Sequence, residues 1–123
     1  MTDAIFEITK AAQFDAAHYM THAQGDDRYR RLHGHSFRVE ASLRGRADPT
    51  AGWVEDFAAL DEALKAIASA LDHGLLNDQP GLENPTLERL CLHFAQKLGP
   101  RFPALSRVVV SRPTIGERCA LDL

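Results

Sequence analysis

The chain has few cysteines and no long apolar run. Its 123 residues include two cysteines, Cys91 and Cys119, which are too few for a disulfide framework. No stretch is long and apolar enough to span a membrane. Residues 1–4 show no basic region followed by an apolar run, so we expect no signal peptide. These absences predict a soluble protein of a reducing, cytoplasmic setting.

The chain also lacks an excess of basic charge. Its formal net charge is −3, and its arginines are scattered apart from Arg28, Arg30 and Arg31. Nucleic-acid binding depends on clustered positive charge, so we expect no nucleic-acid partner. The length is that of one domain, and we expect residues 1–123 to fold as a single unit with a modest core.

Three histidines fall on the apolar faces of two predicted strands. Alternation of period two indicates a half-buried strand. In the second strand, one face carries His33, His35, Phe37, Val39, Ala41 and Leu43. The first strand shows the same alternation up to His18, with Phe14 and Ala16 on its apolar face. A hairpin of these strands would bring His18 beside His33 and His35.

These three imidazoles form a candidate zinc site. Imidazole is a common zinc ligand, and three protein ligands leave a fourth position open, which is typical of a catalytic zinc. The alternative is three ordinary histidines with neutral hydrogen-bond partners. An inward-facing His-X-His pair favours the metal, so the sequence indicates a small metalloenzyme.

Two helices and two further strands follow the hairpin. Asp56 is the expected N-cap of the first helix, whose apolar stripe comprises Phe57, Leu60, Leu64, Ile67 and Leu71. The second helix is predicted to begin with Asn84 as cap and Pro85 at its first position. Strands are predicted at residues 108–110 and from about 117 to 123.

This ββααββ order predicts an α+β fold, in which two helices cover one face of a four-stranded antiparallel sheet. The sheet would end in exposed edges, which isolated proteins avoid. We therefore expect a homo-oligomer whose subunits join edge to edge. Asp72 and His73 end the first helix, where the carboxylate can fix the imidazole tautomer and raise its basicity. The alternative is a histidine favoured only by the helix dipole.

Five runs of the sequence, in the same order, resemble one known family. They cover residues 14–18, 31–37, 52–57, 71–77 and 84–88. In them the chain is similar to the 6-pyruvoyltetrahydropterin synthase and 6-carboxytetrahydropterin synthase family. The resemblance implies the tunnelling fold (T-fold), in which strands from several subunits close a barrel. It also implies a hexamer built from two trimers, with active sites at subunit interfaces.

The resemblance further implies a lyase that acts on the pterin dihydroneopterin triphosphate, in the bacterial branch toward queuosine and other deazapurines. A Zn²⁺ ion, acting as a Lewis acid, would be held by His18, His33 and His35. Asp72 and His73 would assist proton transfer, and Thr86 would contact the substrate. The family also uses a cysteine thiolate as general base and a glutamate near the C-terminus as pterin anchor.

Two of those functional positions differ in this chain. The bacterial branch of the family places its cysteine at the position that is Tyr29 here. The animal branch places it two residues earlier, at the position that is Asp27 here. A phenol with an ordinary pKa of ~10 is a poor base at neutral pH. Some relatives use a glutamate there, so Asp27 or Asp26 is the candidate base. The alternative is a plain loop in which Tyr29 packs.

The second difference lies near the C-terminus, where Arg112 and Pro113 replace the family pair Glu-Thr. A guanidinium has donors only, so Arg112 suits a carboxylate or phosphate. Glu117 is then the candidate pterin anchor, and Cys119 is close enough in sequence to approach the site. The leading interpretation is the zinc-dependent lyase. The alternatives are a divergent zinc-binding paralogue with a different or only bound ligand, and an unrelated zinc hydrolase.

Overall fold

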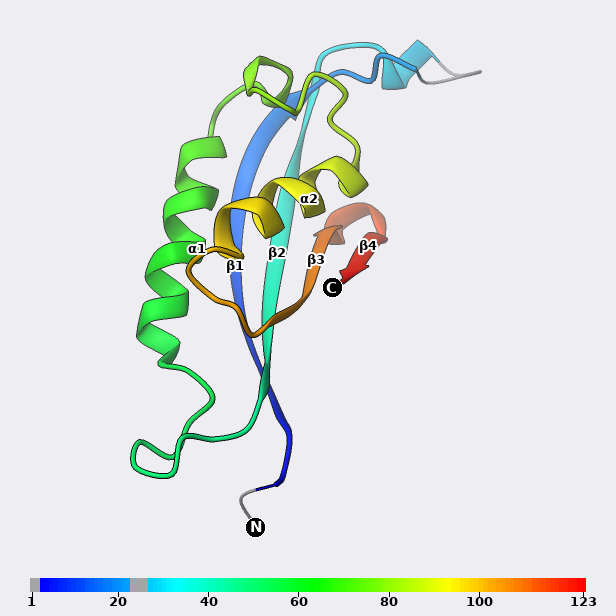
Figure 1. The fold of residues 1–123 in the computed structure, drawn as a ribbon. Helices are drawn as coiled ribbons and strands as arrows, with labels where there is room; N and C mark the ends of the chain where they lie inside the picture. Colours follow the sequence, from blue (N-terminus) through cyan, green and yellow to red (C-terminus); the bar gives the residue numbers. More distant parts are fainter. Residues whose placement is uncertain (1–2, 23–26) are drawn as a thin grey trace.

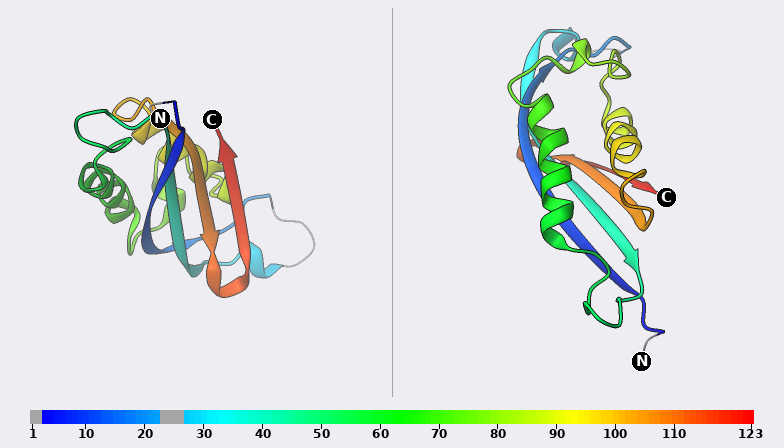
Figure 2. Two further views of the ribbon diagram at one scale, coloured as in Figure 1. Left: turned by 90° about the horizontal axis from the view of Figure 1, so that it is seen from below. Right: turned by 60° about the vertical axis from the view of Figure 1, so that its left-hand side comes forward.

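The computed structural model describes residues 3–22 and 27–123, which form one antiparallel sheet with two helices on one face (Figures 1 and 2). Over these residues the sheet order is β1-β2-β3-β4. The strands are β1 (Phe6–His18), β2 (His33–Gly45), β3 (Leu105–Arg112) and β4 (Glu117–Asp122). The helices are α1 (Phe57–Leu71) and α2 (Leu87–Leu98). The predicted α+β arrangement is therefore confirmed.

The long hairpin of β1 and β2 sets the register that the site depends on. Phe14 pairs with Phe37, and further along the strands His18 lies opposite His33. The two phenylalanine rings stack with centroids 5.1 Å apart. The inward row of β2 is buried from Phe37 to Leu43, as the alternation predicts. The histidines therefore extend the apolar row at the end of the sheet.

The helices divide the inner face of the sheet between them. Helix α1 packs against β1, and α2 packs against β3 and β4. The side chain of Asp56 accepts the N–H of Ala58 at 2.9 Å, which confirms the predicted cap. Phe57 is a correction, since its side chain is 49% exposed. It is the first residue of α1, and the buried part of the stripe begins one turn later, at Leu60.

The predicted start of α2 is wrong by two residues. The N-cap is Thr86, whose hydroxyl accepts the N–H of Arg89 at 3.1 Å. Asn84 instead accepts the hydroxyl of Thr21 at 3.2 Å, and Pro85 precedes the helix. A threonine hydroxyl reaches the N–H three residues ahead, which is the capping geometry, so Thr86 supersedes Asn84.

The segment after α1 covers the outer edge of β1 at the histidine end. His73 donates its backbone N–H to the Asp15 carbonyl at 2.6 Å, and Ala17 donates to the Gly74 carbonyl at 2.9 Å. These bonds fix Asp72 and His73 beside β1, while β4 forms the opposite edge of the sheet. Among the described residues, no helix has the length and apolar composition needed to cross a bilayer.

Candidate metal centre

The hairpin brings the three predicted ligands together. The Nε2 atoms of His18 and His33 are 3.1 Å apart, and one nitrogen from each of the three histidines lies within 4.8 Å of the others. Two nitrogens bound to one tetrahedral zinc at ~2.0–2.1 Å stand roughly 3.3 Å apart. The His18–His33 pair already stands close to this separation, so the cluster suits a single metal ion.

The surroundings prepare these rings for metal binding. The Nδ1–H of His33 donates to the Arg31 carbonyl at 2.6 Å, which leaves the lone pair on Nε2, facing His18. Metal-ligating histidines are usually oriented by such a second hydrogen bond. His18 is fully buried, while His33 and His35 are half-buried. The site is thus closed on the core side and open on the other.

A cavity of about 300 Å³ opens from the cluster. Besides the three histidines, its wall is formed by Met20, Tyr29, Arg112, Ile115 and Glu117. A neighbouring cavity of about 520 Å³ shares Met20, Arg112 and Glu117 with it and reaches Thr86 at the start of α2. The fold therefore gathers the three predicted substrate-binding residues around two neighbouring cavities.

The base candidates of the loop are placed differently. Tyr29 lies on the cavity wall, although it is 49% exposed. Asp27 begins a 3₁₀ turn (Asp27–Tyr29) and is exposed, and it is not on the wall formed by the described residues. Asp26 lies outside the described residues. Tyr29, and not Asp27, thus faces the histidines within this chain.

Neither cysteine replaces the family thiol inside the histidine cavity. Cys91 is buried, and this burial raises the pKa of its thiol to about 12, so it is uncharged at neutral pH. Its Sγ lies 3.5 Å from the Cys119 carbonyl. Cys119 lines the neighbouring cavity, and the described wall of the histidine cavity includes no thiol.

Asp72 and His73 form a hydrogen-bonded pair. Asp72 accepts the backbone N–H of Asp15 with Oδ1 and the Nδ1–H of His73 with Oδ2, both at 2.8 Å. The first of these bonds is the main reason that the pKa of Asp72 is lowered. The carboxylate in turn raises the pKa of His73. His73 has φ of 58°, an uncommon conformation for a non-glycine residue that is frequent at functional sites.

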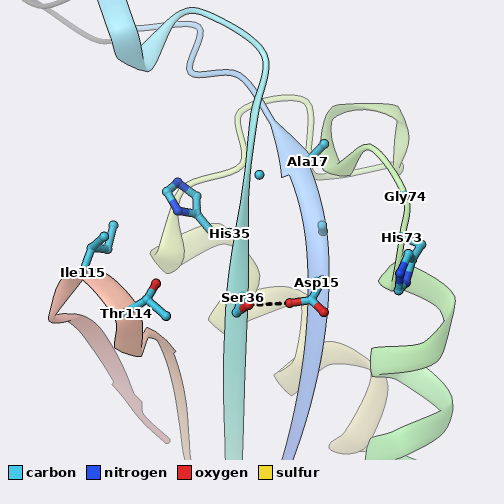
Figure 3. A pocket seen from close by; sticks show the side chains of 10 residues that line it. Asp15, Ala17, His35, Ser36, His73, Gly74, Thr114 and Ile115 are labelled. Carbon is cyan, nitrogen blue, oxygen red and sulfur yellow. Dashed lines mark hydrogen bonds between the residues drawn. The ribbon is translucent and has the colours of Figure 1, made fainter.

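This pair does not share the histidine cavity within one chain. Figure 3 shows His73 beyond β1, whereas His35 lies on the far side of β2. Between them, Ser36 donates its hydroxyl to Asp15 at 2.5 Å. A separate, open cavity of about 750 Å³ is lined by Asp15, His35, Ser36 and His73. Sequence reasoning alone did not reveal this separation or the contributions of Asp15 and Ser36.

Asn77 is a further structural residue that the sequence analysis gave no role. Its buried amide accepts the Tyr19 N–H at 3.0 Å and donates to the Tyr19 carbonyl at 2.9 Å. These bonds fix the backbone directly after His18. Asn77 is the last residue of the run 71–77, which resembles the family, and this position in the sequence could have indicated its importance.

The metal-free protein is expected to lose stability in acid through His18. Burial first, and then the charges of its neighbours, lower the pKa of His18 from 6.5 to about 4. The unfolded chain then binds more protons between these values, so the free energy of unfolding falls as pH decreases from about 6.5 to about 4. The loss is about 3 kcal/mol.

Urea unfolding of metal-free protein at pH 7, 5.5 and 4 measures this loss. His18→Gln removes the titrating group, so its unfolding free energy should depend less on pH than that of the wild type. The exposed His22→Gln is the control and should follow the wild type. Equal pH slopes for wild type and His18→Gln would contradict the expectation.

The sheet, its two helices and the inward histidines define the chain as a T-fold protein with a candidate metal-binding site. The chain belongs to the 6-pyruvoyl tetrahydropterin synthase family, whose model matches residues 7–122. In structure it is similar to the 6-pyruvoyl tetrahydropterin synthase of Caenorhabditis elegans, with a TM-score of 0.84 over 100% of this chain and 99% of that one. That pair is 22% identical, so the likeness concerns the fold.

Two relatives are more similar in sequence. The 6-carboxy-5,6,7,8-tetrahydropterin synthase of Synechocystis is 40% identical in an alignment of 96 positions that covers 74% of this chain and 73% of the relative. The dihydroneopterin monophosphate aldolase of Pyrococcus furiosus is 33% identical over 96 residues, which are 78% of this chain and 77% of the relative.

Proposed function

We propose that the protein is a zinc-dependent lyase of the 6-carboxytetrahydropterin synthase type that acts on dihydroneopterin triphosphate. The observation that carries this proposal is the convergence of three histidine nitrogens beside an open cavity in a chain of this family. The names of the Synechocystis and Pyrococcus relatives support a pterin substrate. The reaction would then serve queuosine or a related deazapurine.

The metal would be held by His18, His33 and His35. When bound, zinc would supply a Lewis acid for the hydroxyls of the substrate side chain. The Arg31 carbonyl holds the tautomer of His33, so this ring presents Nε2 and not N–H to the ion. The burial of His18 keeps its imidazole neutral, which is the form that binds metal.

Asp72 and His73 are the proposed proton carriers. Asp72 holds the imidazole through Nδ1, so Nε2 is free to give or take a proton at the substrate. His73 lies beyond β1 (Figure 3), and neither Asp72 nor His73 is on the described wall of the histidine cavity of its own chain. We therefore propose that the pair serves the cavity of a neighbouring subunit. This requires an oligomer, and a hexamer agrees with the family resemblance.

Glu117 is the proposed pterin anchor. Its carboxylate lines both cavities and can accept hydrogen bonds from the donor edge of a pterin, whereas Arg112 cannot. Thr86 lines the adjoining cavity, where its hydroxyl already accepts from Arg89. The general base would come from the loop of residues 27–29, with Asp27 as the carboxylate candidate.

The second candidate function is a zinc-binding relative that acts on another ligand or only binds one. The observation in its favour is Tyr29 on the cavity wall, at the position where the family carries a thiol. A phenol is a weak base at neutral pH. This candidate predicts metal and ligand binding without turnover of the pterin.

Turnover of dihydroneopterin triphosphate by zinc-loaded protein tests the lyase. Substrate loss and acetaldehyde release should be detectable but slow, and His73→Ala should lower kcat by a further 10²–10⁴-fold, about the contribution of a general acid–base group. His93→Ala, a half-buried histidine outside the cluster, should leave kcat unchanged. A wild type that is inactive while holding zinc and remaining hexameric by light scattering would favour the second candidate.

A further inference from the structure

Arg112 is an arginine in an apolar row. Along β3, Val108 and Val110 are fully buried, and Arg112 follows at the same parity at the end of the strand. Its side chain is therefore directed to the inner face of the sheet, where only 15% of it is exposed. Burial of an arginine costs free energy of desolvation, so a side chain this buried needs a charged or hydrogen-bonding partner that offsets the cost.

The guanidinium lies one ring away from the histidine cluster. Its central carbon is 6.0 Å from the centroid of the Phe37 ring. The same ring packs edge-on against His18 at 6.0 Å and His35 at 5.9 Å. The positive charge of Arg112 contributes to lowering the pKa of both histidines. The cation is thus fixed at the cavity wall by packing.

Glu117 contacts the guanidinium of Arg112 at Nε and leaves its other donors without a described partner. The Nε of Arg112 is 2.7 Å from Oε1 of Glu117, but the N–H is not aimed at the oxygen, so the contact is an ion pair without a formed hydrogen bond. No hydrogen bond joins either Nη to another of the described residues. The Nη edge, which has four N–H donors, is available to a ligand.

The charge balance at the cavity favours an anionic ligand. Glu117 is the single carboxylate on the described wall of the histidine cavity. It faces one guanidinium, and a divalent ion on the histidines would add two further positive charges. An oxyanion placed between the ion and the guanidinium would offset this excess, and arginine binds carboxylates and phosphates through paired N–H donors.

We infer that Arg112 binds an oxyanion of the substrate, either a phosphate ester or a carboxylate, next to the open coordination position of the histidine cluster. The inference rests on the proposed metal centre and assigns Arg112 as a determinant of substrate specificity. The adjoining cavity, which Arg112 and Arg118 also line, provides room for the remainder of an anionic chain. Substrates that carry such a group close to the metal-bound hydroxyls are preferred.

Anion titration of the cobalt(II)-substituted protein tests the inference without catalysis. Inorganic phosphate and acetate are added separately, and the visible spectrum of cobalt reports a ligand at the open position. Wild type should bind at least one of the two anions saturably, and Arg112→Met should weaken that binding about 10-fold or more. Arg112→Lys keeps the charge but loses the paired N–H donors of the guanidinium. Its anion affinity should therefore fall between those of wild type and Arg112→Met.

Arg107→Met is the matched control, because Arg107 is exposed on the same strand and pairs with Asp122 at 2.7 Å away from both cavities. Its anion affinity should equal that of wild type. An Arg112-dependence seen with phosphate identifies a phosphate ester as the natural group, and one seen with acetate identifies a carboxylate. Equal affinity in wild type and Arg112→Met, or binding of neither anion to wild type, overturns the inference.

Failure of the metal centre would be seen separately. If cobalt does not bind, the proposed function fails at its first step, and calorimetric titration of the metal-free protein with phosphate and acetate decides the inference. Arg112-dependent binding there supports it, and binding that ignores the substitution overturns it. If cobalt binds but no Arg112-dependence is found, the inference falls while the metal centre stands.

Discussion

Replacement of His33 and His35 by alanine is expected to remove the metal that wild-type protein carries. Wild type purified without added metal should hold about one zinc per chain. The nitrogens of His18 and His33 are 3.1 Å apart, so both can contact one ion, and the double variant retains one of three ligands. Altering a residue that only orients a ligand already lowers metal affinity roughly 10–100-fold. Loss of two ligands should therefore abolish retention.

Elemental analysis of the purified proteins measures this effect. His93→Ala is the control, since it removes a half-buried imidazole of α2 outside the cluster, and it should keep full zinc. Circular dichroism establishes that both variants remain folded. A wild type without zinc, or a folded double variant with full zinc, would refute the proposed metal centre.

Tyr29→Cys is expected to raise turnover of dihydroneopterin triphosphate by roughly 10²–10⁴-fold, which is the usual contribution of a positioned general base. Tyr29 lies on the wall of the histidine cavity, so the new thiol would face the metal position. A thiol near a metal ion or other positive charge has a lowered pKa and is largely thiolate at neutral pH.

Tyr19→Cys provides the matched control, because Tyr19 is the other tyrosine of the chain and is absent from the described wall of that cavity. It introduces the same thiol at an exposed position and should leave turnover at the wild-type level. The measurement follows substrate loss and acetaldehyde release at equal zinc content. A Tyr29→Cys variant that stays inactive with zinc and hexamer intact would mean that the cavity serves another ligand.

The sequence by itself determined the arrangement of the sheet and the candidate metal ligands. Alternation along β1 and β2 identifies which side chains face inward, because successive side chains of a strand point to opposite faces. This pattern alone places His18, His33 and His35 on one face of the sheet. The motifs around them indicated the family, which the match over residues 7–122 confirms.

The tertiary structure decided what depends on contacts between distant segments. Neighbours in sequence do not reveal that Asp72 is fixed by the backbone of Asp15, or that His73 lies beyond β1 and away from the histidine cavity. The local sequence pattern also predicted Asn84 as the N-cap of α2. In the structure, the side chain of Asn84 accepts a hydrogen bond from the distant Thr21 instead.

Arg112 and Glu117 illustrate the same division. From the sequence, either of them could occupy the position of the glutamate that anchors the pterin in the family. The pairing of β3 with β4 sets them opposite each other, on the wall of the histidine cavity. Strand alternation follows from local backbone geometry and can be read from the chain, but the partner of a charged side chain depends on strand register and packing, which only the folded protein establishes.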